Sequence, residues 1–248
     1  PRSTPIKSTA ASDVYKRQIY TYGNNDKLVV MIHGLGMDKT GYGNFDILAS
    51  RLFDAGFDSL RFDLIGHGES SGSSLDLTLE GTLEVLEELL KVCDFKKLYL
   101  FGASYGCAVA TLYPKTCEKI VLWSPAFGYK KEINNPKTWF VSEFLGEKAI
   151  EKIKKNGYAN FGITGPKFNM NLINDINRYD PVSVLREKRC DIKIFHGDSD
   201  KVESYETSLR LEEMVPNVLV EIIKGGSHCF NDGTSGEVIE KTINFLES

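Results

Sequence analysis

Short apolar runs alternate with longer amphipathic stretches along the chain from Lys27 to Leu246. Runs that are apolar at nearly every position are typical of strands buried on both faces of a parallel sheet, and the stretches between them fit crossover helices. The pattern therefore predicts an α/β fold with a mostly parallel sheet flanked by helices. The predicted strands are residues 28–32, 59–62, 98–101, 120–123, 192–195 and 218–223.

Two stretches depart from this alternation. Residues 1–18 are polar, rich in serine and threonine, and without an apolar period, so we expect a disordered or non-native leader, as on a bacterial metagenomic gene fragment. Between residues 123 and 191 the chain is longer than a simple crossover needs. This length predicts a cap or lid at residues 128–184, inserted into a core formed by residues 19–127 and 185–248.

Aromatic side chains in the predicted cap are candidates for contact with a substrate. Trp139, Phe144, Tyr158 and Phe161 lie there among lysines and asparagines. Each of them fits equally well as an apolar contact that fastens the cap to the body of the protein. The sequence leaves this choice open.

Composition and charge narrow the classes of function. The chain has 248 residues, 42% of them hydrophobic and 26% charged, which suits one catalytic domain. Its net charge is -4 with scattered basic residues, so no nucleic-acid partner is expected. No apolar run approaches the roughly 18 residues of a membrane span. Five scattered cysteines without a Cys-x-x-Cys pair favour the reducing cytoplasm and give no sign of a zinc or redox motif. We expect a monomer or homodimer that needs neither metal nor cofactor.

A candidate nucleophile follows the predicted strand 98–101. Ser104 stands in a Gly-x-Ser-x-Gly pentapeptide, and small helix-compatible residues come directly after it. A sharp turn from strand to helix needs small flanking residues, because the backbone is crowded there and the hydroxyl must project outward. The pentapeptide also occurs by chance in glycine-rich loops. Its place between a strand and a helix is what favours the catalytic interpretation.

A serine nucleophile needs a base, and the chain has four histidines. His33, His67 and His196 precede the position expected for the base, whereas His228 follows the last predicted strand. A triad in the chain order serine, acid, histidine therefore assigns the base to His228. A lone loop histidine is more often a surface residue, but this one completes an order.

The acid is expected after the strand 192–195, where two aspartates stand two residues apart. Asp200 is our choice, and Asp198 is more plausibly a turn former that accepts from nearby backbone amides. Sequence alone leaves an exchange of these two roles open. For the oxyanion hole, backbone amides are needed after the nucleophile and after the first buried strand, which points to Tyr105 and Leu35.

Taken together, these motifs resemble the α/β-hydrolase superfamily over residues 27–246. The resemblance implies an eight-stranded, mostly parallel sheet with a helical cap after the sixth strand, and a triad at Ser104, Asp200 and His228. It rests on His33-Gly34-Leu35-Gly36, Asp63-x-x-Gly66-His67-Gly68-x-Ser70, Gly102-x-Ser104-x-Gly106 and His196-Gly197-Asp198-Ser199-Asp200 with His228.

Within the superfamily, the Gly-x-x-His-Cys-Phe stretch and the cap length are similar to bacterial feruloyl and cinnamoyl esterases. Two features depart from the pattern: Asp200 is followed by Lys-Val-Glu-Ser where Val-Pro is usual, and the leading antiparallel strands look incomplete. We expect a serine carboxylic-ester hydrolase that forms an acyl-enzyme on a small to medium ester. The alternatives are an acylglycerol lipase, a thioesterase, an S33-like peptidase, or an inactive binding protein of the same fold.

Overall fold

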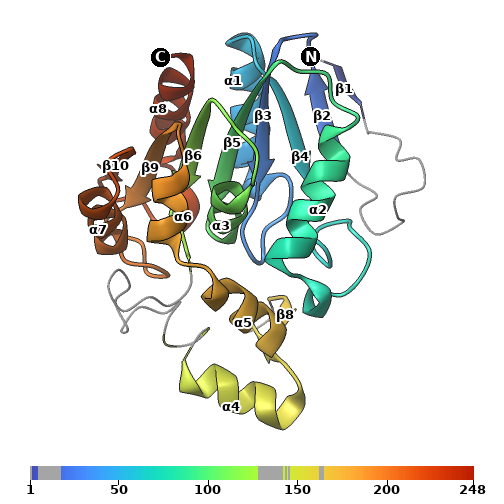
Figure 1. Ribbon diagram of the computed structural model, residues 1–248, viewed down its shortest axis with the longest axis vertical. Coiled ribbons are helices and arrows are strands. Elements are labelled where there is room, and N and C mark those ends of the chain that lie inside the picture. Colours follow the sequence, from blue (N-terminus) through green and yellow to red (C-terminus); the bar gives the residue numbers. More distant parts are fainter. Residues whose placement is uncertain (1, 5–17, 128–141, 143, 145, 162–164) are drawn as a thin grey trace.

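The computed structural model describes residues 2–4, 18–127, 142, 144, 146–161 and 165–248 (Figure 1). Eight strands form one sheet in the order β1-β2-β4-β3-β5-β6-β9-β10. These strands are β1 (Arg2–Thr4), β2 (Gln18–Tyr22), β3 (Lys27–Ile32), β4 (Asp58–Phe62), β5 (Lys97–Ala103), β6 (Lys119–Trp123), β9 (Asp191–Gly197) and β10 (Val218–Ile223).

Six of the strands, from β4 to β10 in the sheet order, run parallel, and β2 runs antiparallel to both of its neighbours. The predicted mostly parallel α/β sheet is thus confirmed. Arg2–Thr4 and Gln18 are strand residues, which differs from the disordered leader expected at residues 1–18. They pair at the edge of the sheet, where backbone hydrogen bonds hold a strand without an apolar run. Residues 5–17 lie outside the described residues, and the foreign origin of the leader stays a prediction.

Helices cover both faces of the sheet. One core contains Val29 and Met31 with the apolar sides of α1 and α8, and the other contains Val30 and Ile32 with residues of α2, α3, α6 and α7. Because both faces are covered, the central strands are apolar at successive positions. The helices are α1 (Asn44–Asp54), α2 (Leu79–Leu90), α3 (Tyr105–Leu112), α4 (Glu147–Asn156), α5 (Met170–Arg178), α6 (Pro181–Glu187), α7 (Tyr205–Met214) and α8 (Ser235–Glu247).

The insertion between β6 and β9 carries α4, α5, α6 and a two-stranded sheet of β7 (Ala159–Asn160) and β8 (Lys167–Phe168). Helices α4 and α5 lie beyond one end of the main sheet, at the bottom of Figure 1. An Asp175 carboxylate oxygen on α5 accepts the backbone N–H of Leu79 at the start of α2, which fastens the insertion to the body. No helix among the described residues has the length and apolar character that crossing a membrane requires.

Candidate active site

Ser104 lies at the turn between β5 and α3 with a backbone φ of 52° and ψ of -117°. A positive φ is strained for a non-glycine residue, and strain of this kind persists only where the surroundings hold it. The flanking glycines allow the close packing: a Cβ on Gly102 would lie 2.5 Å from the carbonyl oxygen of Gly106, and one on Gly106 would lie 2.1 Å from that of Ile32. The turn therefore needs glycine at both positions.

The imidazole of His228 lies against this serine. Its Nε2 is 2.9 Å from the Ser104 Oγ. His228 begins a short 3-10 turn after β10, and the next residue, Cys229, has a φ of 55° and donates its backbone N–H to the Ser124 Oγ at 3.1 Å. Ser124 directly follows β6, so the loop that carries the histidine is fixed to the sheet beside the serine.

Asp200 contacts the other nitrogen of the same imidazole: its Oδ2 lies 2.7 Å from the Nδ1 of His228. Its other oxygen accepts the backbone N–H groups of Val202 at 2.8 Å and Glu203 at 3.0 Å. A second histidine, His196 on β9, places Nε2 3.1 Å from the same Oδ2. The Asp200 side chain is fully buried, and four donors surround its two oxygens.

Asp198, the other candidate acid, faces elsewhere. Its Oδ1 accepts the backbone N–H of Gly225 at 2.7 Å and the hydroxyl of Ser199 at 3.1 Å. This is the turn-forming role that the sequence suggested for it. The geometry thus favours Asp200 over Asp198 as the partner of His228.

Electrostatics in the site act in opposite directions on the acid and the base. Burial raises the pKa of Asp200, but hydrogen bonds from His196 and His228 outweigh it, and the net direction is downward. Burial lowers the pKa of His228, whereas Cys229 and the Asp200 carboxylate raise it, and the net direction is upward. The carboxylate is therefore held ionised, and the imidazole is a stronger base than a free one.

The two predicted oxyanion donors come from loops beside the nucleophile. Tyr105 is the first residue of α3 and directly follows Ser104. Leu35 belongs to the loop after β3, where a Cβ on Gly34 would lie 2.7 Å from the Cβ of Ser104. The glycine thus lets this loop lie against the serine. The donor role of the two amides stays a prediction.

A buried ion pair between Lys39 and Asp63 fixes the loop that carries Leu35. The Nζ of Lys39 lies 2.7 Å from the Oδ2 of Asp63, and the Lys39 backbone N–H donates to the Oδ1 of the same residue at 2.7 Å. Nearby, the Nε2 of His33 accepts the backbone N–H of Leu64 at 3.0 Å, and burial lowers the pKa of His33 to about 4. One of the sequence motifs contains Asp63, but no pattern in the sequence indicated its partner Lys39.

The four predicted cap contacts differ in position. Trp139 lies outside the described residues. Phe144 is 1% exposed and packs its ring on Phe161 and Phe168, so it belongs to an apolar core of the insertion. The ring of Tyr158 lies 4.2 Å from the Lys167 Nζ. Phe161 lies beside the loop that carries Leu35, because a Cβ on Gly36 would lie 3.8 Å from its ring.

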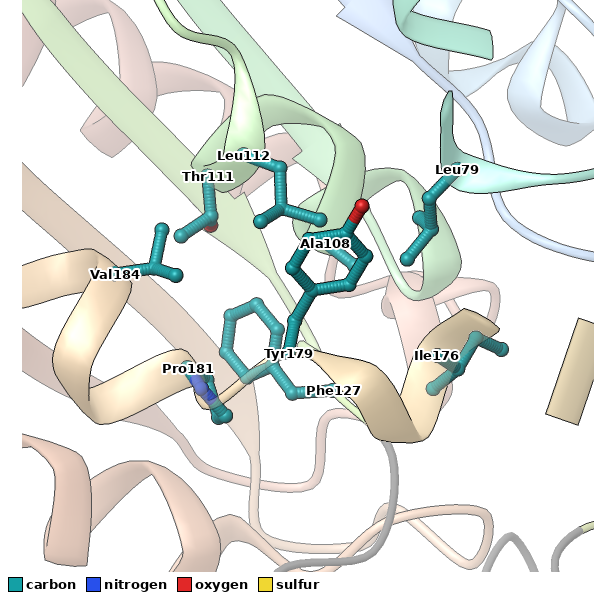
Figure 2. Close-up of a pocket in the computed structure, with 9 residues that line it drawn as sticks. All are labelled: Leu79, Ala108, Thr111, Leu112, Phe127, Ile176, Tyr179, Pro181 and Val184. Carbon is teal, nitrogen blue, oxygen red and sulfur yellow. The ribbon is translucent and has the colours of Figure 1, made fainter. Parts of the chain in front are cut away.

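An apolar pocket separates the insertion from helices α2 and α3 (Figure 2). Its volume is about 10 Å³, which is room for about one water molecule. It contains none of the predicted cap contacts. The lining residues are Leu79, Ala108, Thr111, Leu112, Phe127, Ile176, Tyr179, Pro181 and Val184.

Comparison with known proteins places the chain among hydrolases. Residues 23–161, more than half of the chain, match the model of the Hydrolase_4 family, described as serine aminopeptidase, S33. The chain belongs to this family. It is accordingly a member of the α/β-hydrolase superfamily, as the sequence motifs predicted.

Individual proteins match the chain either over less than half of its length or at low sequence identity. The chain is 32% identical over 115 residues to the 2-hydroxy-6-oxononadienedioate/2-hydroxy-6-oxononatrienedioate hydrolase of Escherichia coli K12, a match that covers 43% of this chain and only 38% of that protein. The structure of Est1E from Butyrivibrio proteoclasticus with bound ferulic acid is similar with a TM-score of 0.74 and 20% identity, covering 94% of this chain and 95% of that one. The structure of a monoacylglycerol lipase from Paleococcus ferrophilus is similar with a TM-score of 0.72 and 20% identity, and the match covers 93% of this chain and 97% of that one. At these identities the two structures support the fold.

Among the described residues, no group of three or more His, Cys, Asp and Glu side chains could hold a metal ion.

Proposed function

We propose that the chain is a serine carboxylic-ester hydrolase with Ser104 as nucleophile, His228 as base and Asp200 as the acid that orients it. The observation that carries the proposal is the continuous chain of contacts from the Ser104 Oγ to the His228 Nε2, 2.9 Å, and from the His228 Nδ1 to the Asp200 Oδ2, 2.7 Å. Both lie within hydrogen-bond distance, which is what activation of a serine requires.

The geometry supports a two-step reaction. His228 takes the hydroxyl proton as Ser104 attacks the ester carbonyl, and the backbone N–H groups of Leu35 and Tyr105 stabilise the oxyanion. The protonated imidazole, held by Asp200, then gives its proton to the leaving alcohol, which leaves an acyl-enzyme. Water, activated by the same histidine, attacks the acyl-enzyme and releases the acid.

We further propose that residues 128–184 act as a cap and that Phe161 contacts the acyl or leaving group. Its position beside the loop that carries Leu35 supports this. A small to medium ester is the substrate class, and a hydroxycinnamoyl ester is the favoured member, by analogy with the ferulic acid bound by the similar Est1E structure. Cleavage of a 2-hydroxy-6-oxo dienedioate is the second candidate, favoured by the 115-residue match to the E. coli hydrolase.

Two measurements test these proposals. Ser104→Ala should abolish turnover of a short acyl ester and labelling by a fluorophosphonate probe, whereas Ser199→Ala, an exposed serine near the site, should leave both unchanged. Full activity in the Ser104→Ala variant would contradict the mechanism. A panel of methyl ferulate, short and long p-nitrophenyl esters, a monoacylglycerol, an acyl thioester, an aminoacyl amide and the dienedioate then ranks the substrates. Preference for methyl ferulate supports the subclass, and preference for another member contradicts it.

A further inference from the structure

Two cysteine side chains lie together at the end of the sheet opposite Ser104. Cys117 precedes β6 and Cys190 directly precedes β9, two neighbouring parallel strands in which Lys119 is paired with Asp191. The two Sγ atoms are 3.5 Å apart, although 73 residues separate them in the sequence. Both are free, partly buried thiols. Strand pairing therefore holds a dithiol where the sequence alone shows two unrelated cysteines.

The surroundings of the pair are accessible and basic. Both cysteines line a surface pocket of about 520 Å³, in which three basic side chains, Lys115, Lys188 and Arg189, outnumber one acidic side chain, Glu187. Positive charge near a thiol favours the thiolate, which is the reactive form. The hydrogen bond from Cys117 lowers the pKa of Cys190, burial opposes this, and Lys188 lowers it further, while Asp191 raises it. The net direction for Cys190 is downward.

The partner thiol is affected in the opposite sense. The hydrogen bond to Cys190, followed by burial, raises the pKa of Cys117. The lowered pKa of Cys190 and the raised pKa of Cys117 favour Cys190 as the thiol of the pair that ionises first. This is the arrangement expected of an attacking sulfur and a resolving sulfur.

We propose that Cys190 and Cys117 form a peroxide-reactive dithiol that closes to an intramolecular disulfide. The Cys190 thiolate attacks one oxygen of a hydroperoxide, so that an S–O bond forms, the O–O bond breaks, and the released alkoxide or hydroxide takes a proton from solvent. Cys117 then attacks the sulfenic sulfur. The S–S bond forms, the S–O bond breaks, and the hydroxide that leaves takes the Cys117 proton as water. The two sulfurs lose two electrons in total, and the peroxide gains them.

Two other cysteines, Cys107 and Cys93, lack this setting. Cys107 is fully buried, and its Sγ donates to the carbonyl oxygen of Gly102 at 3.2 Å. Cys93 donates to the carbonyl oxygen of Leu89 at 3.4 Å, and burial raises its pKa to about 12. Cys93 is partly exposed like the pair but has no second thiol beside it. It is therefore the matched control.

A disulfide at this place would have a structural consequence. It would join the chain just before β6 to the chain just before β9 and thus enclose the whole insertion in a covalent loop. Cross-links that close long loops restrict the unfolded chain. Oxidised protein should therefore melt at a higher temperature than reduced protein, and the proposed ester hydrolysis at the opposite end of the sheet should be unchanged.

The test treats the reduced full-length protein with one equivalent of hydrogen peroxide and maps its peptides after alkylation. The expected result is a peptide pair joined at Cys117 and Cys190, with a mass loss of about 2 Da for the two hydrogens removed, reversed by dithiothreitol. Cys117→Ser should instead accumulate a sulfenic acid at Cys190, trapped by dimedone. Cys190→Ser should form neither product, and Cys93→Ser should behave as the unchanged protein.

Three results would overturn the proposal. One is wild-type protein in which both thiols stay alkylatable after peroxide treatment, a measurement that depends on no variant. Another is a linkage found only between two chains, seen as a dimer on non-reducing electrophoresis. The third is a dimedone adduct at Cys117 in place of Cys190.

Discussion

Replacement of Asp200 by asparagine should show whether Asp200 or its neighbour Asp198 is the catalytic acid, and how much the carboxylate contributes to kcat. Four donors surround the Asp200 side chain: the ring N–H groups of His228 and His196 at Oδ2, and the backbone N–H groups of Val202 and Glu203 at Oδ1. An asparagine has one acceptor oxygen. Whichever way its amide is turned, the NH₂ group meets two donors.

The easiest relief is a change in His228, because its proton can move from Nδ1 to Nε2. The Nε2 then faces Ser104 as a donor and no longer accepts the hydroxyl proton. A wrong tautomer of this kind costs about 10⁴-fold in kcat, or about 5.4 kcal/mol in activation free energy. Asp198→Asn is the matched control: its carboxylate is bound to the exposed Gly225 N–H, and kcat should stay within about threefold of the unchanged enzyme, as for a surface change.

The assay is steady-state hydrolysis of a short p-nitrophenyl ester, with circular dichroism to show that both variants are folded. If Asp198→Asn lost most of the activity and Asp200→Asn kept it, the assignment of the acid would be wrong. Equal losses in two folded variants would refute the tautomer argument, because Asp198 does not contact the imidazole.

Further expectations concern protonation and packing. The kcat/KM of the enzyme should rise with pH as His228 loses its proton, with a midpoint above the ordinary histidine range because its pKa is raised; a pH profile with its midpoint at or below that range would contradict this. Gly106→Ala would bring a Cβ to 2.1 Å from the Ile32 carbonyl oxygen and should cost more than about 3 kcal/mol of unfolding free energy, whereas Gly236→Ala in α8, with open space around it, should stabilise by about 0.5–1 kcal/mol; urea unfolding checks both, and equal effects would refute the packing argument. Burial raises the pKa of Glu203 from 4.5 to about 7, so its contribution to stability is full below pH 4.5 and is lost as pH rises through 7, by roughly 3 kcal/mol. Glu203→Gln should flatten this slope in unfolding curves at pH 5 and pH 8, and an unchanged slope would show that another group titrates.

The sequence predicted most of the sheet because the buried strands carry an unambiguous apolar signal. It did not predict strand β2, Gln18–Tyr22, because this five-residue strand between β1 and β4 mixes polar and aromatic residues and has no apolar run. The strands β7 and β8 have two residues each, which is too short for any period to show. These misses have one physical cause, since a strand that is very short or mixes polar with apolar residues leaves no apolar pattern in the sequence.

At the candidate site, the pentapeptide after a buried strand pointed to Ser104 and chain order pointed to His228, and the structure places these two side chains in contact. Chain order could not decide between Asp198 and Asp200, because two residues in one turn differ in direction and not in sequence context. The contact of His196 with Asp200 depends on the turn that follows β9. Only the pairing of strands in the folded sheet brings such groups together.

The candidate site is expected to form late in folding, because its residues come from strands that are far apart in the sequence. Ser104 follows β5, Asp200 follows β9 and His228 follows β10, and β6 lies between β5 and β9 in the sheet. Contacts between residues so far apart in sequence form slowly, since the chain between them must first be ordered. During refolding, hydrolysis should therefore return after the far-ultraviolet circular dichroism signal of the helices. The time at which turnover recovers would then measure when the last strands of the sheet have paired.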